Sequence, residues 1–394
     1  MNSKRKLYVL ALGVFGITTT EFGVIGVLPD LSKAFQVSIE KAGWLLSAFA
    51  LIVAVFGPIM VSLLSGVNRK KLLLFSLLVF FVCNMMSGLV TGFYLLLIIR
   101  MFPAFFHPVY WSIALAIANT NLKSEDKSKA VGVIFSGLTI ATVLGVPIAT
   151  FISGFINWQW SFYVTGFINL VALVGLQLFL PQVDGKKAVL IYSKRKMLCN
   201  KLLWINMLMA FFVITAMYAT YGYMADFLKS VALMKGSEIS VMFFLFGCIG
   251  ILGNKLAGNL MSKYPYKTTL SFIILLAGVH VLLNVVGNMF IPAVLLIAVW
   301  GFVHSGGFLI SNINITSSTS DAPEFINSIF TSCGNLGVTA GALLGGQVIS
   351  SFGIRQVVWA SVGCLVISFV ILIIKQQIYN KHGSHRIELK GYDN

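Results

Sequence analysis

The stretch PQVDGKKAVLIYSKRKMLCNK, residues 181–201, is the longest polar break in a chain that is otherwise strongly apolar. Of the 394 residues, 58% are hydrophobic and only 10% are charged, whereas soluble proteins carry roughly 25% charged residues. Apolar runs of about 20 residues recur on both sides of this break, and each is long enough to cross a hydrocarbon core of ~30 Å. The alternating pattern of a membrane barrel, in segments of about ten residues, is absent. The composition therefore predicts an all-α polytopic membrane protein.

Six apolar spans precede the polar break and six follow it, so we expect twelve transmembrane helices. The predicted spans are residues 7–28, 43–64, 72–90, 94–118, 131–155, 160–180, 202–225, 238–260, 268–288, 291–315, 326–351 and 354–375. The predicted organisation is an N-terminal six-helix bundle over 1–180, a cytoplasmic linker over 181–201, and a C-terminal six-helix bundle with a short cytoplasmic tail over 202–394.

The two halves of the chain resemble each other at a nearly constant offset. The corresponding positions are Gly57 and Gly253, Ile134 and Ile329, His107 and His304, and Trp158 and Arg355, at offsets of 196, 195, 197 and 197. Each similarity alone is weak, but four of them at nearly one offset are hard to obtain by chance. Repeats of six spans are typical of transporters, whose substrate site lies between the repeats near the membrane midplane. We therefore expect two pseudo-symmetric bundles around a central site.

The net charge of +16 follows the predicted topology. With the N-terminus in the cytoplasm, the cytoplasmic segments hold 21 of the 28 Lys and Arg residues, and the outer loops hold 5. This positive-inside bias predicts that both termini are cytoplasmic. The excess charge then indicates contact with anionic lipid, and nucleic-acid binding is not expected.

Neither cofactor chemistry nor enzyme chemistry is indicated by the residue pattern. The five cysteines show no metal-ligand spacing and no disulfide framework, so we expect no metal and no cofactor. No nucleophile–base pair or phosphate-binding loop is found, so an enzyme is not expected. A gradient must then supply the energy for any transport.

One carboxylate, Glu21, lies inside the first predicted span, in the stretch TTTEFGVIGVLPDL of residues 18–31. It lies ~21 Å above the cytoplasmic end of the span, and Arg100 in the fourth span lies at a similar depth, so the two can meet. An ionisable group inside the membrane is costly and is a functional candidate by default. Three roles are open for Glu21: a permanent partner of Arg100, a proton carrier, or a ligand for a cationic or hydroxyl-bearing substrate.

The fourth span carries polar and aromatic residues on one helical face. Arg100, His107 and Trp111 are spaced at i, i+7 and i+11, and Pro103 and Pro108 loosen the helix between them. Such a face suits a water-filled cavity, although a lone membrane histidine is also often a simple helix contact. The repeat-related histidine favours the cavity. We expect the substrate pathway to include His107, Tyr110, Trp111, Tyr218, His304 and Asn312.

Small residues recur every four positions in spans 5 and 11, so neighbouring helices can approach closely there. Gly137 and Gly145 mark the stripe in span 5, and Pro147 favours a bend close by. This pattern indicates either helix packing alone or, in addition, an interface that slides or rocks between the halves.

Four segments of the chain carry a family resemblance. They are TTEFGVIGVLPDL at 19–31, SGLTIATVLGVPIAT at 136–150, FINWQWSF at 155–162 and DAPEFINSIFTSCGNLGVTAGALLGG at 321–346. The chain resembles the twelve-span drug:proton antiporter branch of the major facilitator superfamily, and within it the sugar, purine-nucleoside and chloramphenicol efflux proteins. The resemblance implies that Arg100 takes part in proton coupling, and that His107 stands where this group often carries histidine.

The loop between spans 2 and 3 departs from the family pattern. Residues 61–70 read VSLLSGVNRK: Arg69 and Lys70 match, but Ser65, Gly66 and Asn68 replace the family's aspartate, arginine and second glycine. That aspartate usually helps to latch the cytoplasmic side, so the latch and the conformational balance are in doubt.

Together these features predict a proton-coupled antiporter that exports a small molecule by alternating access. The expected substrate is a drug such as chloramphenicol, a sugar or a nucleoside, and the expected location is the bacterial plasma membrane. We expect a monomer whose partners are the substrate, protons and lipid, with Glu21 as the proton carrier and Arg100 beside it. The alternatives are a proton-coupled importer of the same fold and, remotely, a receptor that transports nothing.

Overall fold

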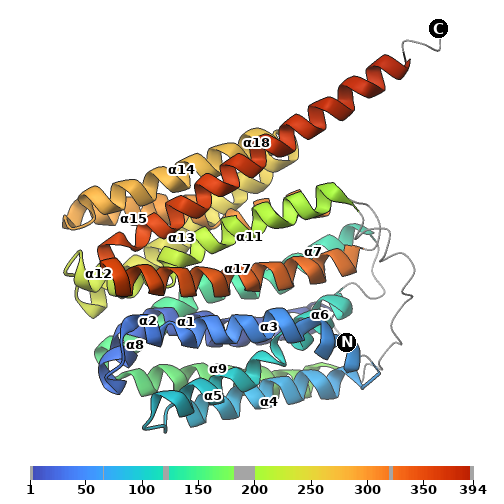
Figure 1. Cartoon of the computed structure of the whole chain (residues 1–394). Coiled ribbons are helices and arrows are strands. Elements are labelled where there is room, and N and C mark those ends of the chain that lie inside the picture. Colours follow the sequence, from blue (N-terminus) through green and yellow to red (C-terminus); the bar gives the residue numbers. More distant parts are fainter. Residues whose placement is uncertain (1–2, 65, 119–123, 182–199, 319–322, 391–394) are drawn as a thin grey trace.

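The computed structural model of the chain (Figure 1) describes the backbone of residues 3–64, 66–118, 124–181, 200–318 and 323–390. The first elements are α1 (Ser3–Phe35), α2 (Ile39–Ala42), α3 (Trp44–Leu63), α4 (Arg69–Ser87), α5 (Phe93–Ala104), α6 (His107–Ala118), α7 (Ser124–Ile140), the π-helical turn η1 (Ala141–Gly145), α8 (Val146–Phe155) and α9 (Trp158–Phe179). The later elements are α11 (Lys201–Tyr221), α12 (Met224–Ser230), α13 (Gly236–Lys263), α14 (Pro265–Val286), α15 (Phe290–His304), α16 (Gly307–Thr316), α17 (Pro323–Phe352), the 3-10 turn η2 (Ile354–Gln356) and α18 (Val357–Lys390).

The predicted all-α membrane fold is confirmed. Eleven spans of the described part are long and apolar enough to cross a membrane. The remaining predicted span, 326–351, coincides with α17, whose side chains are described only from residue 329 onward. No strand occurs in the part of the chain that the structure describes. The predicted linker over 181–201 falls almost entirely outside the described residues, and the predicted domain boundaries stay predictions.

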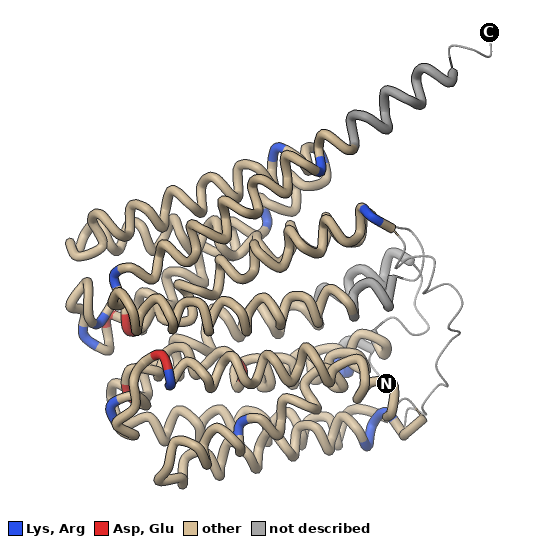
Figure 2. Tube along the Cα trace, in the orientation of Figure 1, with Lys and Arg blue, Asp and Glu red and all other residues tan. Residues whose placement is uncertain are grey.

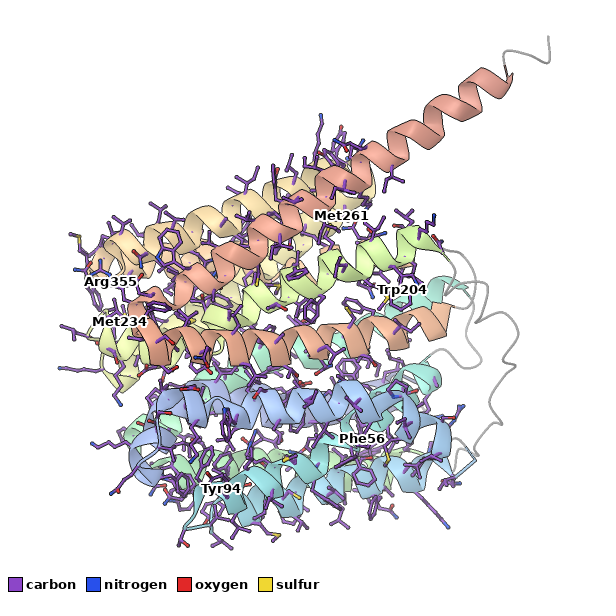
Figure 3. All side chains as sticks on the ribbon, in the orientation of Figure 1. Phe56, Tyr94, Trp204, Met234, Met261 and Arg355 are labelled. Carbon is purple, nitrogen blue, oxygen red and sulfur yellow. The ribbon has the colours of Figure 1, made fainter. Side chains whose placement is uncertain are left out.

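The outside of the molecule has the character of a lipid-facing surface. Phe56, Tyr94 and Trp204 are labelled on the stick view (Figure 3), and 39, 58 and 51% of their surface is exposed. Charged residues occur mainly toward the two ends of the helices (Figure 2). Because so large an apolar surface is rare on soluble monomers, this distribution is that of a protein embedded in a bilayer.

The helices form two groups, which we call the N-terminal group (α1 to α9) and the C-terminal group (α11 to α18) (Figure 1). In the N-terminal group, α1 contacts α7, α8 and α9, and in the C-terminal group, α11 contacts α17 and α18. Between the groups, α3 packs against α17, and α8 and η1 pack against α13. The first helix of each repeat is therefore central in its own group.

The two groups meet closely at the end of the molecule that carries α2 and α12, on the left of Figure 1. There the Asp30 carboxylate accepts a hydrogen bond of 2.5 Å from the Ser153 hydroxyl and lies 3.6 Å from the Lys229 ammonium. A side-chain carbon added at Gly154 would lie 3.4 Å from the Cα atom of Gly236. Backbones of the two groups are therefore in near contact at this end.

Two predicted spans are each built from two helices, and both breaks lie beside a histidine. The fourth span is divided into α5 and α6 just before His107, and the tenth into α15 and α16 just after His304. Pro103 and Pro108 flank the first break. Proline has no backbone N–H to donate to a helical hydrogen bond, so the two residues favour an interruption here. Gly306 lies in the second break.

The fifth span contains an irregular turn close to the position where Pro147 predicts a bend. The π-helical turn η1 covers Ala141–Gly145, directly before the helix that begins at Val146. Such single turns are frequent at functional sites. A side-chain carbon at Gly247 of α13 would lie 2.6 Å from the Cα atom of Val143 in this turn. The irregular turn thus lies at the contact between the two groups.

Candidate functional site

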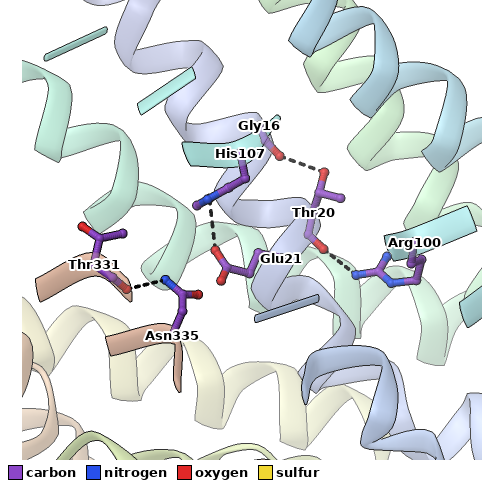
Figure 4. Close-up of polar contacts among 7 residues, drawn as sticks. All are labelled: Gly16, Thr20, Glu21, Arg100, His107, Thr331 and Asn335. Atoms are coloured by element: carbon purple, nitrogen blue, oxygen red, sulfur yellow. Dashed lines mark hydrogen bonds and ion pairs between the residues drawn. The ribbon is translucent and has the colours of Figure 1, made fainter. Parts of the chain in front are cut away.

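The buried carboxylate of Glu21 on α1 faces the imidazole of His107 at the start of α6 (Figure 4). The Oε2–Nε2 distance is 3.2 Å, and the two residues are 3% and 5% exposed. The contact is within ion-pair distance but lacks the angles of a hydrogen bond, so we treat it as an electrostatic contact. A carboxylate and an imidazole in this arrangement can share a proton, since histidine changes its charge near neutral pH.

Arg100 approaches the same turn of α1 from the other side (Figure 4). Its Nη2 donates a hydrogen bond of 2.7 Å to the Thr20 carbonyl, and its guanidinium carbon lies 5.2 Å from the ring centroid of Phe162. No ion pair joins Arg100 to Glu21 among the described residues, so the contact that the sequence allows is not formed in this conformation. Consecutive side chains on a helix diverge by about 100°, and Arg100 therefore holds the backbone next to Glu21.

A polar network fixes this turn of α1 to its neighbours. The Thr20 hydroxyl donates to the Gly16 carbonyl at 3.0 Å. It accepts from the amide nitrogen of Asn84 at 3.0 Å and from that of Asn169 at 3.2 Å. All four residues are buried. Because α4 and α9 each contribute one amide, the position of Glu21 is set by three helices.

The C-terminal group places a related pair in the equivalent positions. An offset of 197 residues relates Glu21 to Tyr218 and His107 to His304. The rings of Tyr218 and His304 have centroids 6.1 Å apart, and Tyr218 stacks on Phe22 at 5.6 Å. Since Phe22 directly follows Glu21, the two repeat-related pairs are connected across the boundary between the groups.

His304 lies among aromatic rings. Its ring centroid lies 5.0 Å from that of Tyr221, 5.2 Å from that of Phe246 and 6.1 Å from that of Trp300. The residue is 6% exposed. The environment of this histidine is therefore apolar, whereas His107 faces a carboxylate.

The other predicted pathway residues occupy different surroundings. Tyr110 is completely buried and donates a hydrogen bond of 3.2 Å to the Leu10 carbonyl. Trp111 packs against Phe135, with ring centroids 5.4 Å apart. The Asn312 carbonyl accepts a hydrogen bond of 2.9 Å from Thr316. The structure thus brings Glu21, His107, Tyr218 and His304 together, and their roles and those of the other three residues stay predictions.

The small residues of spans 5 and 11 face the first helix of their own group. A side-chain carbon at Gly137 would overlap the Ala11 carbonyl of α1, and one at Gly341 would lie 2.6 Å from the Thr215 carbonyl of α11. A carbon at Gly145 would overlap the Thr19 hydroxyl. These contacts favour packing within each group as the role of the stripes.

The loop before α4 is anchored within the N-terminal group. The Lys70 ammonium donates a hydrogen bond of 2.9 Å to the Gln177 carbonyl of α9, and Arg69 is the first residue of α4. The Asn68 side chain caps α4 by accepting from the Lys71 amide at 3.1 Å. No atom comes within 4 Å of a side-chain carbon added at Gly66, and Ser65 lies outside the described residues.

Two polar residues near the site were not assigned a role from the sequence. Asn84 contacts Thr20, and its offset of 196 from the buried His280 could have marked it. Asn335 points from α17 toward the Glu21 side of α1 (Figure 4). Its amide nitrogen donates to the Thr331 carbonyl at 3.0 Å. No three His, Cys, Asp or Glu side chains in the described part are arranged to hold a metal ion.

The model of the Major Facilitator Superfamily matches residues 10–325 and 237–388 of the chain. The chain therefore belongs to this superfamily of membrane transporters. It is 28% identical over 353 residues to a "Probable sugar efflux transporter" of Helicobacter pylori strain P12, covering 89% of this chain and 90% of the relative. It is also 28% identical over 368 residues to the "Inner membrane transport protein YdhP" of Escherichia coli strain K12, covering 93% and 94%.

Solved structures share the fold. A bacterial homologue of the human lysosomal transporter Spinster, inward-facing and occupied, superposes with a TM-score of 0.77 over 94% of this chain and 96% of that chain, at 17% identity. The nucleoside transporter NupG superposes with a TM-score of 0.75 over 95% and 100%, at 14% identity.

Proposed function

We propose that the chain is a proton-coupled efflux transporter in the bacterial inner membrane, with Glu21 as the residue that binds the proton. The observation that carries the proposal is the buried pair of Glu21 and His107 at 3.2 Å, next to the boundary between the two groups. A buried carboxylate without a function would be costly. The efflux relative of Helicobacter pylori supports export. The proposed substrate is a sugar, a nucleoside or an amphipathic drug, and no enzymatic step is involved.

In this proposal the two groups of helices rock about the central site. Both termini are placed in the cytoplasm, so the close contact around Asp30 and Lys229 is at the outer face, and the conformation is closed to the outside. Substrate binds from the cytoplasm while Glu21 is ionised, and a proton from outside binds Glu21 when the transporter has turned outward. The cycle runs because the two conformations differ in their affinity for proton and substrate. The working unit is a monomer.

Sealed proteoliposomes with a pH-sensitive dye test this function. Candidate sugars, nucleosides and chloramphenicol-like drugs are added, and proton movement is recorded for the wild type, Glu21→Gln and the matched control Glu40→Gln. We expect proton movement opposite to substrate in the wild type and the control, and none in Glu21→Gln. Movement of proton and substrate in the same direction would show an importer. Proton movement fully coupled to substrate in Glu21→Gln would show that Glu21 is not the residue that binds the proton.

A further inference from the structure

A small cavity lies inside the N-terminal group, beside the guanidinium of Arg100. Its volume is about 10 Å³, which is enough for one water molecule. The wall is formed by α1, α4, α5, α8 and α9. Its polar lining residues are Thr19, Thr20, Asn84, Arg100, Ser161 and Thr165.

Three buried polar atoms, each belonging to a residue of this wall, have no hydrogen-bond partner in the described part of the chain. They are the Arg100 Nε, the Asn84 Oδ1 and the Thr19 Oγ1. The three residues are 3%, 1% and 2% exposed, so bulk water does not reach them. Buried polar groups are almost always hydrogen-bonded, and three orphans around one cavity therefore indicate a common partner.

The hydroxyls of Ser161 and Thr165 and the amide nitrogen of Asn84 already have partners. The Ser161 hydroxyl donates to the Ala149 carbonyl at 2.6 Å, and the Thr165 hydroxyl donates to the Ser161 carbonyl at 2.7 Å. The Asn84 amide nitrogen donates to the Thr20 hydroxyl at 3.0 Å and to the Phe80 carbonyl at 2.7 Å. These two acceptors fix the orientation of the amide, so the Asn84 Oδ1 is left as a buried acceptor on a residue that lines the cavity.

The three orphaned atoms define the chemistry of what they bind. Arg100 Nε offers a donor, Asn84 Oδ1 offers an acceptor, and the Thr19 hydroxyl can do either. An anion would suit Arg100 but would face the lone pairs of Asn84, and a cation would face the guanidinium. A molecule that both donates and accepts, and that fits about 10 Å³, satisfies all three. We infer that one water molecule is bound here, accepting from Arg100 and donating to Asn84 and Thr19.

This water gives the Nε atom of Arg100 a hydrogen-bond acceptor. The guanidinium then has Nη2 on the Thr20 carbonyl, its face toward Phe162 and Nε on the water. Arg100 is positioned without a carboxylate, and Asn84 becomes a positioning residue that acts through the water. The Glu21 carboxylate is left free to exchange its proton, a consequence that rests on the proposed function.

X-ray hydroxyl-radical footprinting of the purified full chain tests the water site. Radiolysis of a bound water oxidises side chains next to it even when they are buried. Phe162 lines the cavity and is 4% exposed, whereas Phe243 is 1% exposed and lies in the other group. We expect Phe162 to be oxidised several-fold faster than Phe243. Equal rates for the two residues would overturn the proposal.

Variants of the lining make the test specific. Asn84→Leu keeps the approximate side-chain shape and removes the acceptor together with the amide donor to Thr20 and Phe80, so oxidation of Phe162 should fall several-fold. Ser76→Ala is the matched control, because Ser76 is buried on the same helix and donates to the Leu72 carbonyl at 2.8 Å, away from the cavity. If Asn84→Leu does not fold, Thr19→Val removes a second partner and should lower the same rate. An unchanged Phe162 rate in a folded variant would contradict the water site.

The positioning role has its own readout. The pH profile of substrate-induced proton release should have a displaced midpoint in Asn84→Leu and an unchanged midpoint in Ser76→Ala. An unchanged midpoint in both variants would show that Asn84 only packs against its neighbours and has no positioning role. The footprint depends on the water whether or not the chain transports protons, whereas the Glu21→Gln assay tests transport. Failure of one proposal is therefore distinguishable from failure of the other.

Discussion

Two ionisable side chains lie at one turn of α1, Glu21 on the turn itself and Arg100 against its backbone, and they are held in different ways. Glu21 faces a second titratable group, His107, at 3.2 Å. Arg100 is held by a carbonyl and an aromatic face, at 2.7 Å from the Thr20 oxygen and 5.2 Å from the centroid of Phe162. A carboxylate paired with imidazole can change its charge, whereas a guanidinium stays charged. A pair whose charge can change and a guanidinium whose charge is constant therefore lie at the same turn of α1.

We expect Arg100→Lys to destabilise the protein although it keeps the positive charge. An ammonium lacks the planar fork that can donate to Thr20 and lie over the ring of Phe162 at once. The expected loss is roughly 1–3 kcal/mol, measured as a lower thermal unfolding midpoint in detergent. Arg355→Lys is the control: Arg355 also donates to a carbonyl, that of Asn284 at 2.8 Å, but it is exposed. A similar loss in both variants would show that burial does not matter here.

His107→Gln tests the other side of the same turn. Glutamine can still donate to Glu21 but does not titrate near neutral pH. We expect the variant to fold and its pH profile of proton release to differ from that of the wild type, because the carboxylate has lost its imidazole partner. His280→Gln is the control, because His280 is buried against Trp300 at 5.2 Å, away from the carboxylate. A profile that changes in both variants would argue against a Glu21–His107 unit.

At this scale the sequence predicts the candidate functional residues better than it predicts their contact partners. Glu21 and Arg100 can be found because charge inside an apolar span is costly. The partner of Glu21 could not be found, because it depends on how α1 and α6 are rotated and on the break between α5 and α6. The repeat offset could have marked Asn84, but not its unpaired Oδ1, since burial and hydrogen bonding are properties of the packed structure.

At the scale of helices, the contact between α1 and α7 depends on a missing side chain. A carbon at Gly137 would overlap the Ala11 carbonyl, and a backbone atom cannot move aside as a side chain can. We expect Gly137→Ala to lower stability by roughly 1–3 kcal/mol, the usual effect of overpacking. Thermal unfolding in detergent measures it.

Gly278→Ala is the matched control for that substitution. Gly278 lies inside α14, and no atom comes within 4 Å of an added side-chain carbon. Alanine favours a helix over glycine by roughly 0.5–1 kcal/mol, so this variant should be slightly more stable than the wild type. If both variants lose stability alike, the loss comes from the helix backbone and not from the contact with α1.

The helices themselves were largely predictable, and their interruptions were predictable only in part. Runs of apolar residues mark the spans because the bilayer sets their length. Pro103 and Pro108 predict the break in the fourth span. The break at Gly306 contains no proline that could have predicted it. The short helices α2 and α12 lie at the end where the two groups meet, and no local sequence pattern predicts that contact.

At the scale of the whole molecule, the contact between the two groups near Asp30 holds the end with α2 and α12 closed. Its ion pair to Lys229 is 37–46% exposed, and such a pair contributes only about 0–1 kcal/mol. Weak charge pairing here suits the opening of this end that the proposed transport cycle requires.

A disulfide between Gly154→Cys and Gly236→Cys should lock this end. Each added side-chain carbon lies 3.4 Å from the facing Cα atom, and a disulfide needs its two Cβ atoms about 3.5–4.5 Å apart. In a chain whose five cysteines are replaced by serine, oxidation should abolish transport and a reductant should restore it. Each single cysteine variant serves as a control. Full transport by the oxidised double variant would mean that this end does not open.

The stacked rings of Phe22 and Tyr218, 5.6 Å apart, give the molecule an optical reporter of its own state. One ring belongs to α1 and the other to α11, so the stack persists only while these two helices are in contact. An environment-sensitive fluorescent amino acid in place of Tyr218 would be shielded from water by Phe22 in the stacked arrangement and would change its emission when the rings part. The open and closed populations of a single molecule could then be followed by light, without any knowledge of what it carries.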